Sequence, residues 1–356
     1  MKSSAFVFAL LGASVGSAFA QHSATVYGVL DAGVVSERCD GCSTRVDSGV
    51  ASESRIGVRG SEALGDSLSA VYALEAGVQE DTGRSDQGGR LFGREAYVGV
   101  KGKGGTVTVG RHQNLEYVAL TDVGDPFKGG MAGSATNLIG NGGRRVDNSI
   151  QYYSAEVRGV SAAASYGLGE IAGDRAADRV WGVSVGFESG PVTLRAAHQN
   201  RNFVRVAPAT AMGNNLDAKN SIIAANLRIG IGTAYVAYSA SRGWGSSPLW
   251  NPDNPYGAAM ASTPSTDSRD VLVGMAVPVG NATLLASYVR KNDRDLANQD
   301  ANQVAFGASY AMSRRTDFYA AYSRITNRNG AGYTVGNASS QGRGSSAVNL
   351  GMRHAF

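Results

Sequence analysis

The sequence has little of several features that would place it in common protein classes. It contains only 2 Cys and 8 Pro among 356 residues, and its formal net charge is only +4. A small charge surplus gives little support for a polyanionic partner, so no nucleic-acid partner is expected. No stretch reaches the ~18 consecutive apolar residues that suggest a transmembrane helix. These absences disfavour a helical membrane protein and a nucleic-acid-binding protein.

Groups that could bind a metal or carry out catalysis are also scarce. The four histidines, at positions 22, 112, 198 and 354, are scattered without metal-ligand spacing. The segment at 101–105, Lys-Gly-Lys-Gly-Gly, lacks the ending of a phosphate-binding loop. A Ser/His esterase site, for instance one using His198, has no nucleophile-elbow sequence to support it. We therefore expect no enzyme activity, no cofactor and no metal.

The two cysteines, Cys39 and Cys42, stand in Cys-Asp-Gly-Cys within a polar segment between strand-like stretches. A thioredoxin-like redox motif needs a strand before it and a helix after it. Two thiolates alone do not complete a tetrahedral metal site. We expect a small loop disulfide formed in an oxidising compartment, with free thiols or a metal or redox role as the alternatives.

Residues 1–20 have the layout of a secretory signal peptide. Lys2 supplies the positive start, residues 5–15 form a short apolar run, and Ala18-Phe19-Ala20 offers small residues for cleavage. We expect the mature chain to comprise residues 21–356 as one domain, because no linker or internal repeat divides it. Export without a membrane helix leaves a soluble secreted protein or an outer-membrane barrel.

The main structural signal is the alternation of side chains along short segments. Residues 181–187 place Trp, Val, Val and Phe on one parity and Gly, Ser and Gly on the other, and residues 304–310 show a similar pattern. Since successive side chains of a strand point to opposite faces, one face is apolar and the other small or polar. A soluble sandwich and a membrane barrel both produce this pattern.

The connections between these segments favour the barrel. Short turns alternate with much longer polar loops, as in outer-membrane barrels, and seven turns with eight loops join sixteen strands. The turns lie at residues 62–67, 101–105, 155–159, 188–191, 229–232, 278–281 and 313–316. The loops lie at residues 35–53, 79–90, 112–147, 167–179, 199–219, 239–269, 291–302 and 325–346. We predict an all-β, antiparallel, 16-stranded transmembrane barrel wide enough for an aqueous channel.

The chain ends with a further alternating strand that closes on Phe356, as outer-membrane barrels do for assembly. Over its whole mature length it resembles the trimeric general porins of β-proteobacteria. The matching segments are VYGVLDAG (26–33), SRIGVRGSE (54–62), LG (64–65), RLFGREA (90–96), GTVTVGR (105–111), DPF (125–127) and RVDNS (145–149). The resemblance implies an outer-membrane homotrimer that passes small hydrophilic solutes and inorganic ions, contacts membrane lipid, and meets the barrel-assembly machinery through its last strand.

In the family that the sequence resembles, the third loop folds into the barrel and narrows it. The third long segment here carries Asp125, Pro126, Phe127 and Lys128 followed by two glycines, similar to the family's pattern. Gly and Pro permit a tight inward turn, although an ordinary external turn is the alternative. Lys128 departs from the family pattern and adds a cation beside the constriction.

The resemblance also places arginines on the barrel wall opposite carboxylates of the third loop. The alternation of side chains supports an inward position for Arg55 and Arg59, and for Arg145 together with Asp147. It is less clear for Arg94, which alternates in step with Val98, and for Arg111, which alternates in step with Val107 and Val109. The predicted wall residues are Arg55, Arg94, Arg111, Arg144 and Arg145. The predicted loop acids are Glu116, Asp122 and Asp125. Because the wall arginines and Lys128 outnumber these acids, we expect a modest anion preference. The alternative for Arg59 or Arg144 is a salt bridge to a local carboxylate with no role in the pore.

Three other readings of the chain stay open. A substrate-selective anion channel of the same fold would show saturable conductance. A structural or adhesive protein would bind surfaces through its long loops without channel activity. A soluble secreted sandwich would not purify with the outer membrane.

Overall fold

The computed structural model describes residues 23–202, 217–243, 245–248 and 265–356. The predicted signal peptide at 1–20 and the predicted mature start at Gln21 lie outside the described residues. So do parts of the fifth and sixth predicted loops.

Sixteen long strands form one antiparallel sheet that closes on itself. Its first eight strands are β1 (Ser23–Glu37), β3 (Arg55–Gly65), β4 (Leu68–Gln79), β6 (Glu95–Gly102), β7 (Gly105–Gln113), β8 (Arg145–Ser154), β9 (Val160–Gly167) and β10 (Val180–Ser189). The other eight are β11 (Val192–Asn202), β12 (Asp217–Ile229), β13 (Gly232–Arg242), β14 (Asp267–Val279), β15 (Ala282–Asp293), β16 (Ala301–Ala311), β17 (Thr316–Asn327) and β18 (Ser346–Ala355). Two short strands lie in loops: β2 (Arg45–Ser48) of the first loop pairs with β1, and β5 (Arg84–Ser85) of the second loop pairs with β4. The predicted 16-stranded barrel is confirmed.

The two ends of the chain close the barrel. Strand β1 pairs with β3 on one side and with β18 on the other. The amide of Phe356 donates to the carbonyl of Gly28 at 3.1 Å, and the amide of Gly28 donates to the carbonyl of Phe356 at 3.2 Å. Because no edge is left open, the backbone polar groups of the wall are satisfied within the sheet, as a lipid environment requires.

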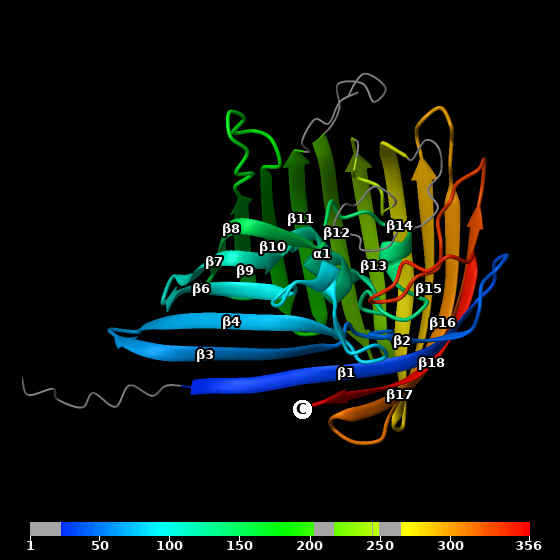
Figure 1. The fold of residues 1–356 in the computed structure, drawn as a ribbon, viewed down its shortest axis with the longest axis horizontal. Coiled ribbons are helices and arrows are strands. Elements are labelled where there is room, and N and C mark those ends of the chain that lie inside the picture. Colours follow the sequence, from blue (N-terminus) through cyan, green and yellow to red (C-terminus); the bar gives the residue numbers. More distant parts are fainter. Residues whose placement is uncertain (1–22, 203–216, 244, 249–264) are drawn as a thin grey trace, which may run out of the picture.

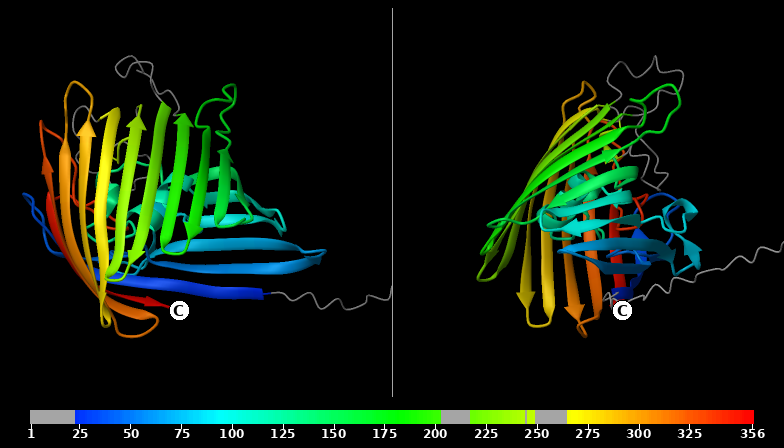
Figure 2. Two further views of the ribbon diagram at one scale, coloured as in Figure 1. Left: turned by 180° about the vertical axis from the view of Figure 1, so that it is seen from behind. Right: turned by 90° about the vertical axis from the view of Figure 1, so that its left-hand side faces the viewer.

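The strands of the two walls run in different directions (Figure 1). Strands β1, β3, β4 and β6 of the near wall run across the strands β10 to β16 of the far wall. Strands of a closed barrel tilt by about 35–45° from its axis, so strands on opposite walls cross at a large angle. Figure 2 shows the barrel from behind, where the strands of the far wall face the viewer, and from the side.

The alternation read from the sequence corresponds to the outside and the inside of the barrel. On β10, Val183, Val185 and Phe187 are exposed on the outer face. On the inner face, polar side chains such as Gln199, Asn220 and Gln303 are buried by the contents of the lumen. The sequence alternation therefore separates an apolar exterior from a polar interior.

The connections at the two ends differ in length as predicted. The seven short turns comprise residues 66–67, 103–104, 155–159, 190–191, 230–231, 280–281 and 312–315. Gly190 and Gly280 have φ values of 55° and 62°, which favour glycine over other residues in such turns. Six turns lie within the predicted range or extend one residue beyond it, with bounds that differ by at most two residues, whereas the first was predicted from residue 62 and β3 continues to Gly65. The described helices include none that is both long and apolar enough to cross a membrane.

The third loop (residues 114–144) folds into the barrel, as predicted. It contains α1 (Leu115–Val118), η2 (Ala119–Gly124) and η3 (Ala135–Asn137), and α1 and η2 contact the inner faces of β10, β11 and β12. Asn114 caps α1 by accepting a hydrogen bond from the amide of Glu116 at 2.7 Å. One further short helix, η1 (Gln87–Gly89), lies in the second loop.

An apolar core forms where the third loop meets the wall. Leu120, Phe127 and Ile139 of the loop belong to one buried cluster with Ile222 and Leu272 of the inner wall. The inner face of β12 to β16 therefore carries apolar residues among its polar ones, and the third loop rather than water covers them.

The two faces can be tested with a pair of adjacent substitutions. Val185→Arg places a charge on the lipid-facing side and should destabilise the barrel by about 2–4 kcal/mol, whereas Ser184→Arg points into the lumen and should cost much less. Unfolding titrations in lipid vesicles would measure both. Equal losses for the two variants would contradict the assignment of faces.

Candidate functional site

A cavity of about 190 Å³ lies between the third loop and wall residues of β3, β8 and β18, and we call it the narrow cavity. Its lining includes five cationic side chains and two carboxylates. These are Arg55, Arg94, Lys128, Arg145 and Arg353, with Glu53 and Asp122.

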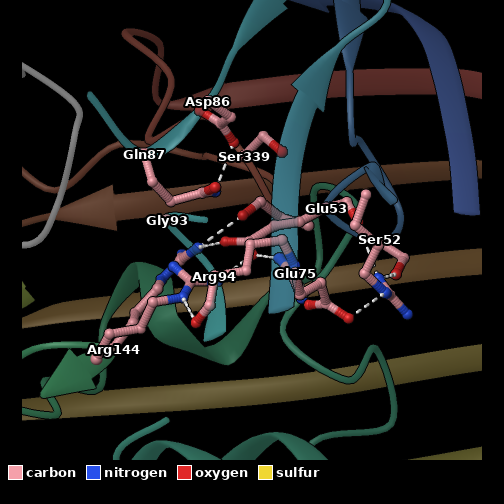
Figure 3. Close-up of polar contacts among 12 residues, drawn as sticks. Ser52, Glu53, Glu75, Asp86, Gln87, Gly93, Arg94, Arg144 and Ser339 are labelled. Atoms are coloured by element: carbon pink, nitrogen blue, oxygen red, sulfur yellow. Dashed lines mark hydrogen bonds and ion pairs between the residues drawn. The ribbon is translucent and has the colours of Figure 1, made fainter. Parts of the chain in front are cut away.

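One buried carboxylate, that of Glu53, organises the arginines of this region (Figure 3). Arg144 Nη1 lies 3.0 Å from Glu53 Oε1. Arg94 Nη1 and Arg145 Nη2 both contact Glu53 Oε2. Glu53 ends the first loop, Arg94 precedes β6, and Arg144 and Arg145 join the third loop to β8. The ion cluster therefore ties three loops together at the entrance to the narrow cavity.

Further hydrogen bonds extend this cluster. Arg94 Nε donates to Glu75 Oε1 of β4 at 2.6 Å. Arg144 Nη1 donates to the carbonyl of Ala338 in the eighth loop at 2.6 Å. Arg145 Nε donates to the carbonyl of Arg94 at 3.1 Å. Such charge-assisted bonds are roughly twice as strong as neutral ones, so the guanidinium groups are held in fixed positions.

Arg55 lies in the lumen, on the face that its parity predicts. Its Nη1 donates to Ser52 Oγ at 3.0 Å and to the carbonyl of Glu53 at 2.8 Å. Its Nε lies 3.7 Å from Glu75 Oε2. Arg59, on the same face, stacks over the ring of Tyr27 at 4.8 Å.

The third loop contributes two exposed charges, Asp122 and Lys128. Both line the narrow cavity opposite the arginines. Partial burial raises the pKa of Asp122 above its ordinary value, while the positive charges of Arg195 and Lys128 oppose that rise. The loop therefore presents one acid and one base to the lumen.

The other two predicted loop acids do not face the arginines. Asp125 is fully buried, and its carboxylate accepts from the amides of Phe127, Gly129 and Ala135, each at 2.9 Å. Burial raises the pKa of Asp125 to about 6 against these donors. Asp125 therefore holds the Asp-Pro-Phe turn in shape, which corrects its expected role in the pore field.

Glu116 is also fully buried and is not among the residues that line the narrow cavity. Neither of its carboxylate oxygens has a hydrogen-bond partner. Burial, and then the negative charge of Asp270, raises the pKa of Glu116 well above its ordinary value. Asp270 itself pairs with Lys291 at 2.7 Å, and both side chains are buried. Glu116 therefore belongs to the packed side of the third loop, where burial favours its protonated form.

Arg111 lies apart from the cluster, contrary to its predicted lumen position. Its Nε donates to the carbonyl of Gly93 at 2.8 Å, and its Nη1 contacts Asp147. Arg111 shares the parity of Val107 and Val109, which are exposed on the outer face. The β7–β8 register shifts beside Gly110 and His112, and this bulge moves Asp147 out of the inward alternation.

Pro126 and Phe127 fix the loop rather than line the cavity. A Cβ atom built on Gly274 would lie 2.8 Å from Pro126 Cγ, and one built on Gly307 would lie 2.8 Å from Phe127 Cε1. Only glycine leaves room for these rings on the inner wall. The Asp-Pro-Phe segment is therefore seated on β14 and β16.

The cysteines lie in the first loop, far in sequence from the arginine cluster. The structure joins Cys39 and Cys42, whose Cα atoms are 5.3 Å apart, as a disulfide. Glu37 offers an oxygen within 4.8 Å of the two sulfurs. Sulfurs that are bonded to each other are not thiolate ligands, so the disulfide is incompatible with a metal site in this state.

Comparison with known proteins agrees with this geometry. A family model described as Gram-negative porin matches residues 6–330. The chain belongs to the Gram-negative porin family. It is 27% identical to an outer membrane porin protein of Bordetella pertussis, with all of both chains covered. The protein is an outer-membrane porin, and its barrel is a channel for small hydrophilic solutes and ions.

Two solved structures share the fold of this porin. One is an anion-selective porin from Comamonas acidovorans, with a TM-score of 0.73, 23% identity, and 94% of this chain and 100% of that chain covered. The other is the trimer form of OmpT from Vibrio cholerae, with a TM-score of 0.66, 18% identity, and 94% and 99% coverage.

The sequence analysis missed three residues of this site in the porin, namely Glu53, Glu75 and Arg353. Arg353 lies on the inner face of β18 and pairs with Asp317 at 3.0 Å. Alternation alone would place Glu75 and Arg353 inside, since their sequence neighbours Leu74 and Met352 are apolar and face outward. Glu53 stands two residues before Arg55, but its three arginine partners come from distant parts of the chain, so the sequence offers no signal for the cluster.

Removing the central charge of the cluster should destabilise the porin. Glu53→Gln leaves buried guanidinium groups without their carboxylate, so we expect the free energy of unfolding to fall by roughly 3–5 kcal/mol. Urea unfolding in detergent would measure it. Glu156→Gln, at an exposed acid in a short turn, is the matched control, and a similar loss in both variants would contradict the role of Glu53.

The buried Glu116 should make stability depend on pH. The pKa of Glu116 is raised in the folded state, so the folded porin keeps a proton that the unfolded chain releases above pH ~4.5. The free energy of unfolding therefore falls as the pH rises from ~4.5 toward the raised pKa. Glu116→Gln should make this fall above pH ~4.5 less steep. Glu188→Gln, at an exposed acid, should keep the wild-type slope, and an unchanged slope in Glu116→Gln would refute the assignment.

Proposed function

We propose that this porin conducts small anions in preference to cations. The observation that carries the proposal is the charge of the narrow cavity, which has five cationic side chains against two carboxylates. Fixed charges around a narrow aqueous gap raise the local concentration of the opposite ion. The solved porin described as anion-selective supports the proposal by its shared fold.

The location of each charge strengthens this argument. Glu53 lies under its arginine partners, with 8% of its side chain exposed, and so it contributes little field to the water path. Arg55, with 24% of its side chain exposed, and the exposed Lys128 are nearer to passing ions. Asp122 is the one exposed carboxylate among the described residues of the cavity. The accessible balance is therefore positive.

We further propose that three copies form the working assembly. Strands β6, β7 and β9 have only eight or nine residues. Tilted strands need ~9–11 residues to cross a bilayer, so this wall suits contact with another subunit better than contact with lipid. The trimer form of OmpT, a protein of the same fold, supports the proposal.

We also propose that residues 1–20 direct export and are removed, and that the strand ending at Phe356 is presented to the barrel-assembly machinery. Phe356 pairs with Gly28 of β1, so the last strand completes the sheet. Assembly that begins from this strand would leave closure of the barrel as its final step.

Zero-current potentials in a salt gradient test the ion preference. For porin reconstituted in planar bilayers we expect an anion preference that Lys128→Gln lowers and Asp122→Asn raises, because each changes the exposed charge of the third loop. Arg158→Gln, in an exposed turn, should change nothing. A clear cation preference of the wild type would refute the proposal, and a current that saturates with one anion would instead favour a substrate-selective channel.

A further inference from the structure

The outer face of the barrel carries an apolar groove across β10 to β13, on the wall that the left view of Figure 2 shows from outside. Its volume is about 330 Å³, which falls within the ~300–1,000 Å³ of ordinary ligand sites. Val183 and Val185 form one side, and Ile223 and Tyr238 form the other. A groove of this size is distinct from the lumen and from the charged cavity described above.

The strand register explains why the surface is hollow at this point. In one row across the strands, Val183 pairs with His198, His198 with Ser221, and Ser221 with Ala240. In the next row, Val185 pairs with Ala196, and Ile223 pairs with Tyr238. The small side chains of Ala196, Ser221 and Ala240 form the floor between bulkier neighbours.

The row above the groove is polar and basic. Lys219 pairs directly with Arg242 in the register, one row beyond Ser221 and Ala240, and both side chains are exposed. Trp181 stands in the same row on β10. Lys219 and Arg242 therefore lie within ~7 Å along the strands of the top of the groove.

Arg242 keeps capacity for a second anion. Its Nε lies 3.8 Å from Asp267 Oδ2, while 62% of its side chain is exposed. The other oxygen of Asp267 pairs with Arg269 Nη1 at 2.7 Å. Arg242 is thus only loosely engaged by the carboxylate nearest to it.

We infer that this face binds a phosphorylated lipid of the outer leaflet, with an acyl chain in the groove and a phosphate between Lys219 and Arg242. The basic row stands where β12 begins and β13 ends, next to the long connections at 203–216 and 243–266. Long connections of outer-membrane barrels face outward from the cell, which places the basic row at the level of the outer-leaflet headgroups. Trp beside Lys and Arg is typical of such an interface.

The chemistry of the two parts of the site agrees with one occupant. Two adjacent cations suit a phosphate, and the almost wholly apolar groove beneath them suits hydrocarbon. A free phosphate ion would use only the basic row, and a neutral apolar molecule would use only the groove. A lipid with a phosphate headgroup uses both.

The test uses the detergent-solubilised full chain and measures the binding of diphosphorylated lipid A by native mass spectrometry. Lys219→Gln with Arg242→Gln should weaken binding about 25-fold, because each of the two cations that meet the phosphate above the groove contributes about fivefold, the size of effect that one basic residue has on anionic lipid. Ala240→Phe, which fills the groove and keeps both cations, should also weaken binding. Ion conductance of every variant should stay at the wild-type value, which shows that the barrel is intact.

Matched controls separate this site from general attraction to a basic surface. Arg290→Gln with Arg324→Gln removes two exposed cations from β15 and β17, and Ala320→Phe adds the same ring to the outer face of β17. These variants should bind lipid A as the wild type does. Any of three outcomes would overturn the inference. Test and control variants could lose binding equally, the Lys219→Gln, Arg242→Gln variant could bind as the wild type does, or inorganic phosphate could compete as strongly as the lipid.

Discussion

The structure depends on a requirement of the backbone: within a bilayer every N–H and C=O group must find its partner inside the protein. Pairing of β1 with β18 meets that requirement by removing both edges of the sheet. The remaining features follow from closure. A closed sheet of sixteen strands has an outside that must be apolar and an inside wide enough for water, and the third loop has space to enter.

The inward loop turns part of the lumen into a protein core. Leu120, Phe127 and Ile139 are covered by apolar residues of the wall, while Asp122 and Lys128 remain in water. One side of the loop is thus fixed by packing, and the other presents charged side chains to the lumen. Glu116 and Asp125 belong to the packed side, where burial raises their pKa values and hydrogen bonding or protonation replaces solvation.

Charges near the narrow cavity differ in what they contribute. Arginines 94, 144 and 145 surround Glu53 and hold the first, second and third loops in place, so much of their charge is spent on structure. Arg55 and Lys128 are more accessible to water. Cationic side chains of the same region therefore differ in how far they are withdrawn from water, and the buried ones are held by Glu53.

The sequence by itself determined the barrel, its strand number and its turns, because alternation of side chains and the lengths of connections are local properties that each strand carries independently. It also determined the inward face of Arg55. The inward third loop was expected only from the resemblance to a family. The alternation also indicated the outward placement of Arg111, which shares the parity of Val107 and Val109. Tertiary structure alone decided the partners of Glu53, the burial of Glu116 and Asp125, and the pairing of Asp147 with Arg111. Those depend on loops distant in the chain meeting in the lumen and on one bulge between β7 and β8, and neither is encoded in the period of a single strand.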